Sequence, residues 1–322
     1  MKTSSPFSTR IHNFHVFPAI LDVYETQMIH YTQTIIANAP RKEYLIMRNT
    51  ILHLKDYYPF LGTDHADPTL ELYLPFNMTE MEQEHQKRPC ILICPGGGYG
   101  FCSQRESEII ALHFLPQGFN AFVLTYSTEP HRYPTQVREV AAALELIHKH
   151  ADEWNCDTSK IALMGFSAGG HLTASYATKF DTPEIREVFP ESKQVAATIL
   201  SYPVITADMS FTHQGSILNL LGHEPSAEEV RYHSCEQNVN PNTPPAFIWH
   251  TASDASVPVA NSLVYATALS KYQIPYELHI FPFGAHGLSV SNPEVSRVMT
   301  PDITYDHTWV DCLMKWLNQY FI

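Results

Sequence analysis

The pentapeptide Gly-Phe-Ser-Ala-Gly at residues 165–169 constrains the fold of this chain more than any other feature. It follows an apolar run at residues 161–164 and leads into residues 170–177, whose composition is typical of a helix. A serine between two glycines, at a turn from strand to helix, forms a nucleophile elbow that holds the serine hydroxyl above the edge of a sheet. Side chains two residues before and two after the serine would collide with neighbouring backbone, so glycine is needed there. The competing interpretation is a glycine-rich turn that contains a serine by chance.

Strand-like and helix-like segments alternate from about residue 68 onward. The expected strands cover residues 69–75, 90–94, 121–126, 161–164, 196–202, 246–250 and 277–281. The expected helices cover residues 103–115, 135–154, 170–177, 261–271 and 308–322. This alternation predicts an α/β fold, with a mainly parallel central sheet flanked by helices on both faces. The polar–apolar alternation of residues 69–75 is typical of an outer strand. Ligands bind such sheets at the carboxyl ends of the strands.

Two regions do not follow this alternation. Residues 207–243 lie between two expected strands and are rich in polar, Pro and His residues, so we interpret them as a small cap inserted over the site. Residues 1–60 form an N-terminal extension of uncertain structure, and residues 61–322 form the catalytic domain that the pattern predicts. An extension of this kind can pack on a second subunit, which leaves a homo-oligomer open.

Two later residues are candidates for the groups that would activate Ser167. A serine hydroxyl is a weak nucleophile, and it needs a base to take its proton and an acid to orient that base. The chain order in this fold is Ser, then Asp or Glu, then His. Asp254 follows an expected strand and precedes Val-Pro and a helix, and His286 lies beside small residues in the loop after the last strand. A helix-capping aspartate and a loop histidine without function are the alternatives. His250 and His279 lie inside expected strands and are interpreted as packed or capping residues.

The run of three glycines at residues 96–98 lies in a loop after an expected strand. A loop at this place supplies one oxyanion donor, and the residue after the nucleophile supplies the other. We therefore expect the backbone N–H groups of Gly97, Gly98 and Ala168 to form an oxyanion hole. A phosphate cradle or a plain turn is the alternative reading, but the chain has no G-x-x-x-x-G-K-[ST] motif. Tyr99 and Phe101 stand beside the loop and are expected to line the substrate pocket.

These motifs together resemble the α/β-hydrolase superfamily. The Pro-Gly-Gly-Gly-Tyr and Gly-Phe-Ser-Ala-Gly-Gly-His segments, Asp254 and His286 are most similar to the carboxylesterase branch related to hormone-sensitive lipase, in particular to acetyl-esterase and acetyl-xylan-esterase-like proteins. The segments at residues 105–108 and 118–124 are similar to that subgroup too. The resemblance covers roughly residues 68–318. Pro95 stands where the family often has histidine, which weakens a lipase interpretation.

The resemblance implies a serine esterase with the triad Ser167, His286 and Asp254. We expect it to hydrolyse short-acyl esters, above all acetyl esters of sugars or oligosaccharides, through an acyl-enzyme and without a cofactor or a metal ion. A serine peptidase or amidase on the same fold is one alternative. A non-catalytic protein that binds a ligand in the same pocket is the other.

Composition and charge limit the classes of binding partner that we expect. The chain has 322 residues, is 44% hydrophobic and carries a formal net charge of −13. Such an acidic surface repels nucleic acid and anionic membranes, so we expect neither as a partner. The first eight residues lack the apolar run of a signal peptide, and we expect a cytoplasmic protein with six free cysteines. The cluster at residues 148–150, His-Lys-His, is interpreted as the solvated face of a helix.

Overall fold

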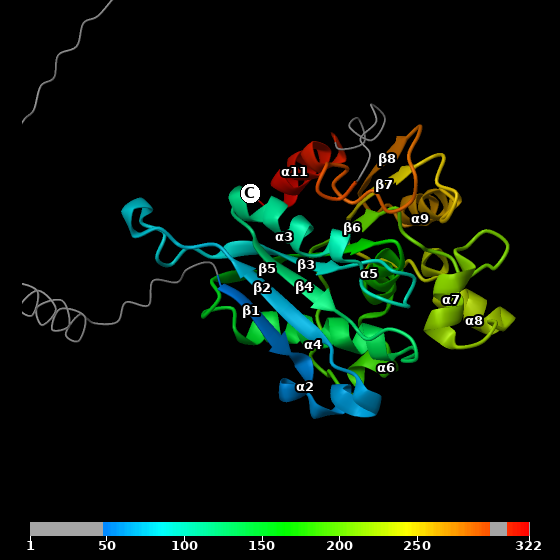
Figure 1. The fold of residues 1–322 in the computed structure, drawn as a ribbon, viewed down its shortest axis with the longest axis horizontal. Coiled ribbons are helices and arrows are strands. Elements are labelled where there is room, and N and C mark those ends of the chain that lie inside the picture. The colour runs from blue at the N-terminus through cyan, green and yellow to red at the C-terminus, as the bar shows by residue number, and fades with distance from the viewer. Residues whose placement is uncertain (1–47, 297–307, 322) are drawn as a thin grey trace, which may run out of the picture. The chain divides into compact units, whose positions relative to one another are not determined.

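The structure is a computed structural model that describes residues 48–296 and 308–321. These described residues belong to one compact unit. At the centre of the described part lies an eight-stranded sheet with the order β1-β2-β4-β3-β5-β6-β7-β8 (Figure 1). The strands are β1 (Arg48–His53), β2 (Thr69–Leu74), β3 (Arg88–Cys94), β4 (Asn120–Thr125), β5 (Cys156–Phe166), β6 (Ala197–Ser201), β7 (Ala246–Thr251) and β8 (Tyr276–Phe281). β2 is antiparallel to β1 and to β4, and all other neighbours are parallel.

Helices cover both faces of this sheet (Figure 1). The α-helices in the described ranges are α2 (Leu54–Tyr57), α3 (Glu108–Phe114), α4 (Thr135–Lys149), α5 (Ala168–Lys179), α6 (Pro183–Arg186), α7 (Gln214–Leu221), α8 (Ala227–His233), α9 (Ala260–Lys271) and α11 (Thr308–Phe321). The side chains of α3 and α11 share one apolar cluster, and those of α4 and α5 share another. The predicted α/β class with a mainly parallel sheet is confirmed.

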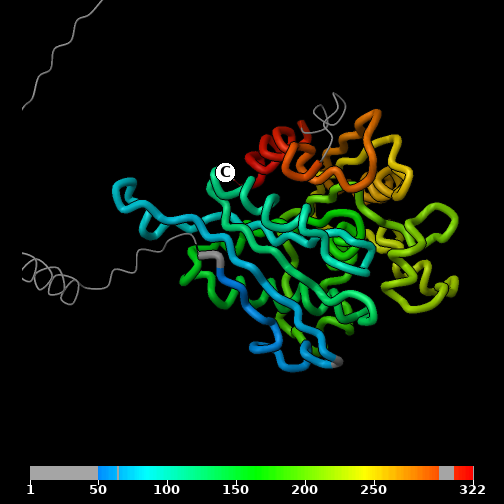
Figure 2. Tube along the Cα trace, viewed as in Figure 1, coloured from blue at the N-terminus to red at the C-terminus, as the bar shows by residue number. Residues whose placement is uncertain are grey.

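The strands belong to both clusters because successive side chains point to opposite faces. In β3, Leu92 packs in the cluster of α4 and α5, whereas Ile91 and Ile93 pack in the cluster of α3 and α11. This two-sided burial explains why the strand is an uninterrupted apolar run. The Cα trace shows α11 returning beside α3 (Figure 2), and the ring centroids of Phe119 and Phe321 lie 6.3 Å apart.

Several predicted boundaries were wrong. The segment at residues 69–75 is not an outer strand, because β1 pairs with the edge of β2 that faces away from β4. Residues 48–60 therefore belong to the same unit as the sheet rather than to an extension. The rest of that expected extension, residues 1–47, lies outside the described residues. The helix expected at residues 135–154 ends at Lys149, and the one expected at 103–115 is split into the 3-10 turn Gln104–Glu106 and α3.

The segment expected to form a cap holds α7, α8 and the 3-10 turn Cys235–Gln237. His213 caps the first of these helices, and Ser226 caps the second with a reciprocal pair of hydrogen bonds to Glu229. None of the described helices is long and apolar enough to cross a membrane.

Candidate active site

Ser167 occupies the sharp turn between β5 and α5. Its backbone has φ 52° and ψ −117°, a strained conformation for a residue with a side chain. A Cβ atom on Gly165 would lie 2.1 Å from the carbonyl oxygen of Gly169, and one on Gly169 would lie 2.1 Å from that of Cys94. The turn therefore excludes side chains at the two positions where the sequence has glycine.

Ser167, His286 and Asp254 form a continuous chain of hydrogen bonds. His286 Nε2 lies 2.8 Å from Ser167 Oγ, and His286 Nδ1 lies 2.6 Å from Asp254 Oδ2. With a carboxylate at Asp254, Nδ1 carries the imidazole proton and donates it. Nε2 is then the acceptor for the hydroxyl proton of Ser167. The three side chains that the sequence selected thus meet in the arrangement of a general base and a nucleophile.

Asp254 is held as a carboxylate. Burial opposes its ionisation, but hydrogen bonds from His250 and His286 outweigh burial and hold the pKa of Asp254 well below its usual range. The backbone N–H groups of Ser256 and Val257 donate to Oδ1 at 2.9 Å each. Oδ2 is thereby left for the two histidines.

The glycine loop after β3 lies beside the serine. Gly97 has φ 124° and Gly98 has φ 65°, so both residues turn the backbone in a way that glycine allows. Among the described residues, the N–H groups of Gly97, Gly98 and Ala168 donate no backbone hydrogen bond. The first N–H groups of a helix are free for an external acceptor, and Ala168 is the first residue of α5. All three N–H groups remain candidates for oxyanion donors.

A cavity of about 410 Å³ opens over this arrangement. Its walls come from the glycine loop, the elbow, the loop of His286 and the segment before and within α7. The lining residues are Gly97, Gly98, Gly100, Phe101, Ser103, Arg105, Glu106, Ser167, His213, Gly215, Asn219, Ser256, His286 and Gly287. The expected cap segment thus contributes His213, Gly215 and Asn219 to the same cavity as Ser167.

The two aromatic residues of the glycine loop lie in different places. Phe101 lines the cavity and is 63% exposed. Tyr99, by contrast, is buried and does not line the cavity, which corrects the expectation for this residue. Its backbone has φ 58°, and its hydroxyl lies 2.9 Å from Nδ1 of His171 in α5. Since His171 Nε2 donates to the carbonyl of His233, Nδ1 accepts from Tyr99. Tyr99 therefore ties the glycine loop to the helix behind the nucleophile.

A comparison with protein families matches the BD-FAE family model to residues 70–269, which include the glycine loop, the serine and the aspartate. The chain belongs to the BD-FAE family. Known relatives include endo-1,4-beta-xylanase B of Butyrivibrio fibrisolvens, 40% identical over 69% of this chain and 36% of its own length. An acetylxylan esterase of Xylanibacter ruminicola is 33% identical over 63% of this chain and 42% of its own length. The chain thus spans roughly two fifths of the length of these curated relatives.

Solved structures carry the same fold. The acetyl ester-xyloside bifunctional hydrolase of Caldicellulosiruptor lactoaceticus has a TM-score of 0.74 and 33% identity, and the match covers 85% of this chain and 97% of that chain. A carboxylesterase of Lactobacillus plantarum has a TM-score of 0.69 and 30% identity, with 80% and 94% of the two chains covered. This BD-FAE chain therefore has the α/β-hydrolase fold that the motifs predicted.

Sequence reasoning missed a buried carboxylate of this BD-FAE chain that connects the glycine loop to the base. Glu106 Oε2 accepts the N–H of Gly96 at 2.8 Å, and Oε1 accepts the hydroxyl of Tyr202 at 2.6 Å. The Tyr202 hydroxyl accepts the N–H of Ser289 at 2.9 Å, and its ring packs edge-on against His286. Burial raises the pKa of Glu106, although hydrogen bonds from Tyr202 and Gly96 oppose this effect. The available sequence signal was the similarity of residues 105–108 to the esterase subgroup, which gave Glu106 no role.

Two further polar residues of the site were missed or were given no role. His250 is buried as expected, but its Nε2 also lies 3.3 Å from Asp254 Oδ2. Asn219 of α7 donates from Nδ2 to the carbonyl of Gly98 at 2.9 Å. This bond fixes the expected cap segment against the glycine loop. The only sequence signal for Asn219 was its position in a polar insertion.

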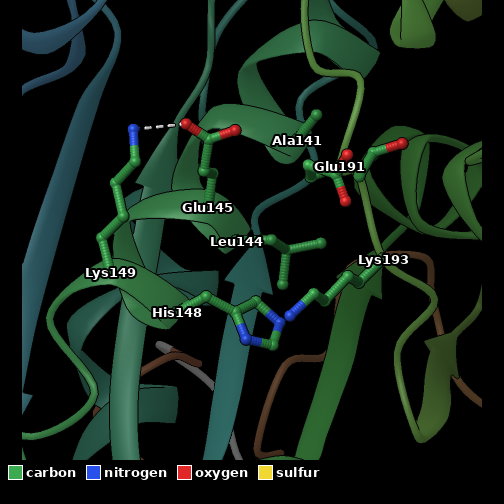
Figure 3. Close-up of a pocket in the computed structure, with 8 residues that line it drawn as sticks. Ala141, Leu144, Glu145, His148, Lys149, Glu191 and Lys193 are labelled. Atoms are coloured by element: carbon green, nitrogen blue, oxygen red, sulfur yellow. Dashed lines mark ion pairs between the residues drawn. The ribbon is translucent and has the colours of Figure 1, made fainter.

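A second cavity, of about 340 Å³, lies beside α4. The close-up in Figure 3 shows the ring of His148 beside the end of Lys193, and the ion pair of Lys149 with Glu145. His148 is half-buried and lines this cavity rather than a fully solvated face, and burial together with the nearby Lys193 lowers its pKa. His150 stacks on Trp154 at 4.7 Å. No hydroxyl or thiol is hydrogen-bonded to His148 among the described contacts, so the Ser167 cavity is the better candidate for catalysis.

The described residues contain no group of three or more His, Cys, Asp or Glu side chains arranged to hold a metal ion. All six cysteines lie in the described part and are free, and four of them are buried.

Proposed function

We propose that this chain is a serine-dependent carboxylic ester hydrolase that removes short acyl groups, acetyl above all, from the hydroxyl groups of xylan-type sugars. The observation that carries the proposal is the relay of Ser167, His286 and Asp254, which opens onto the cavity beside the glycine loop. Removal of the serine proton by an oriented histidine is what hydrolysis of a neutral ester requires.

In the first half of the reaction, His286 Nε2 takes the hydroxyl proton while Ser167 Oγ forms a bond to the acyl carbon. The carbonyl oxygen becomes an oxyanion, which the N–H groups of Gly97, Gly98 and Ala168 would stabilise. The bond from the acyl carbon to the alcohol oxygen then breaks, and the leaving alcohol takes the proton from Nε2. An acyl group remains on Ser167.

In the second half, a water molecule replaces the alcohol. His286 Nε2 takes a proton from the water as its oxygen bonds to the acyl carbon. The bond to Ser167 Oγ then breaks, the serine recovers its proton from Nε2, and the carboxylic acid leaves. Asp254 keeps the proton on Nδ1 and stabilises the imidazolium in both halves.

The proposal of a sugar ester as substrate is based on the names of the related proteins. One is named an acetylxylan esterase, another an endo-1,4-beta-xylanase, and one structural neighbour an acetyl ester-xyloside hydrolase. The cavity is consistent with such a substrate, because the exposed Phe101 offers an aromatic surface to a sugar and polar side chains in the same lining can bond to hydroxyls. The acidic net charge also favours a neutral substrate.

The test compares the parent protein with Ser167→Ala on p-nitrophenyl acetate, butyrate and octanoate, and on acetylated xylo-oligosaccharides. We expect turnover to be highest for acetyl esters, and Ser167→Ala to lower kcat by at least about 10⁴-fold. Ser103→Ala is the matched control, because Ser103 lines the same cavity but is not hydrogen-bonded to His286 in the described structure. Turnover that survives in Ser167→Ala, or a preference for aminoacyl p-nitroanilides over esters, would refute the proposal.

A further inference from the structure

His213 lines the active-site cavity and takes no part in the relay. It directly precedes α7 and lines the cavity together with Ser167 and His286. Its ring also lies near the glycine loop, since Cε1 would be 3.7 Å from a Cβ atom on Gly98. The bond from Asn219 Nδ2 to the carbonyl of Gly98 holds α7, and with it His213, at this place.

The hydrogen bonds of α7 fix the tautomer of His213. The backbone N–H of Ser216 donates to His213 Nδ1 at 3.2 Å, in a bond shared with the carbonyl of His213, and the Ser216 hydroxyl lies 2.8 Å from the same nitrogen. A backbone N–H can only donate, so Nδ1 must be an unprotonated acceptor. The single proton of the neutral ring is therefore on Nε2. Burial and the nearby His286 lower the pKa of His213, which keeps the ring neutral.

Nε2 has no hydrogen-bond partner among the described residues, and it is not enclosed. It is a donor of fixed orientation on a residue that lines the cavity. The N–H groups of the glycine loop and Ala168 are the candidate donors to the acyl carbonyl oxygen of an acetyl ester. An acetyl group has no other polar atom. A further neutral donor is therefore available to a hydroxyl or ring oxygen in the alcohol part of the substrate.

We propose that His213 Nε2 donates a hydrogen bond to a hydroxyl or ring oxygen of the alcohol part, and so makes the site selective for sugar esters over esters of alcohols without such groups. The inference rests on the proposed esterase function and adds a residue that selects the substrate. A neutral N–H donor of this kind can bond to an uncharged hydroxyl or ring oxygen of a polyhydroxylated alcohol.

The experiment measures kcat/KM for acetylated xylobiose and for p-nitrophenyl acetate in the parent and in His213→Asn. Asparagine is a good N-cap residue, so the variant keeps a cap on α7. Its side chain is too short to place a donor at the position of His213 Nε2. We expect the ratio of the two kcat/KM values, sugar ester over aryl ester, to fall on the order of 10-fold. Both values come from one preparation, so partial unfolding cancels from the ratio.

Ser216→Ala is the matched control, because it keeps the backbone N–H that fixes the tautomer and should keep the ratio of the parent. A parent that hydrolyses both esters and a His213→Asn variant with an unchanged ratio would overturn this inference and leave the esterase function standing. A fall of the ratio in Ser216→Ala equal to that in His213→Asn would also overturn it, by assigning the effect to the cap of α7. A parent without activity on the sugar ester would overturn both the inference and the proposed substrate.

Discussion

His286 Nε2 lies 2.8 Å from Ser167 Oγ although 119 positions of the chain separate the two residues. The sheet explains this approach. Ser167, Tyr202, Asp254 and His286 follow the ends of the adjacent parallel strands β5, β6, β7 and β8, in that order. The loop after β8 brings His286 to Ser167, and the ring of Tyr202 packs edge-on against His286 at a centroid distance of 5.1 Å. Each neighbour in the sheet therefore supplies one part of the relay or its support.

Asp254→Asn should inactivate the enzyme without unfolding it. Oδ1 accepts two backbone N–H groups, so the amide oxygen of asparagine would take that place and its NH₂ group would face His286. His286 Nδ1 would then have to accept, and the proton would move to Nε2, where it blocks acceptance from Ser167. We expect kcat for p-nitrophenyl acetate to fall on the order of 10⁴-fold. A loss of less than about tenfold in a protein of parental melting temperature would contradict the relay.

Glu106→Gln should impair both stability and turnover, because its two oxygens accept from Gly96 and Tyr202. An amide has one acceptor and one donor, so one of these buried bonds is lost. We expect the free energy of unfolding to fall by about 1–3 kcal/mol, measured by urea denaturation, and kcat to fall with it. Glu108→Gln, at an exposed glutamate two residues later, is the control and should change neither. Equal effects of the two substitutions would show that the Glu106 contacts do not matter.

Gly169→Ala should destabilise the fold strongly. Its Cβ would lie 2.1 Å from the carbonyl oxygen of Cys94, which is backbone and cannot move alone. We expect a loss of about 3 kcal/mol or more in the free energy of unfolding, or no soluble protein. In Gly100→Ala the nearest atom would be Nδ2 of Asn219 at 3.3 Å, the end of a side chain, so this variant should stay folded. The reverse order of stability would show that the elbow is not packed as described.

The fold could be predicted from sequence because its signals are local. An apolar run such as residues 90–94 is buried on both faces and so indicates a parallel strand without further information. The elbow is equally local, since the steric demand on Gly165 and Gly169 arises within one turn. β1 could not be recognised in this way. Its placement depends on pairing with β2, and the sequence of an edge strand contains no record of its partner.

Within the site, the expectation that functional residues follow strand ends selected Ser167, Asp254 and His286, which the structure joins by hydrogen bonds. It did not predict the direction of the side chains in the neighbouring loops. Tyr99 and Phe101 stand two positions apart, yet one is buried against His171 and the other lines the cavity. The positive φ of Tyr99 decides this, and loop dihedrals do not follow from composition. The role of Glu106 could not be predicted for a related reason. It depends on a hydrogen bond with Tyr202, which lies 96 positions away in the chain.

Lys179 should make stability depend on pH in the alkaline range. Its side chain is 2% exposed, its Nζ has no hydrogen-bond partner in the described structure, and it lies 4.1 Å from the ring centroid of Tyr232. Burial lowers the pKa of Lys179 to about 8 in the folded protein, against 10.5 for an ordinary lysine. Between these values the unfolded chain binds the proton and the folded protein does not, so stability rises with pH.

Lys179→Met removes this titration and keeps an apolar chain of similar length. The free energy of unfolding of the parent minus that of Lys179→Met should therefore increase from pH 7 to pH 10, by up to about 3 kcal/mol. Urea denaturation of both proteins at the two pH values measures this difference. Lys149→Met, at an exposed lysine of α4, is the control, and its difference from the parent should stay nearly constant. A difference for Lys179→Met that does not change with pH would mean that the buried amine keeps its proton throughout this range, so that the ring of Tyr232 compensates for its burial.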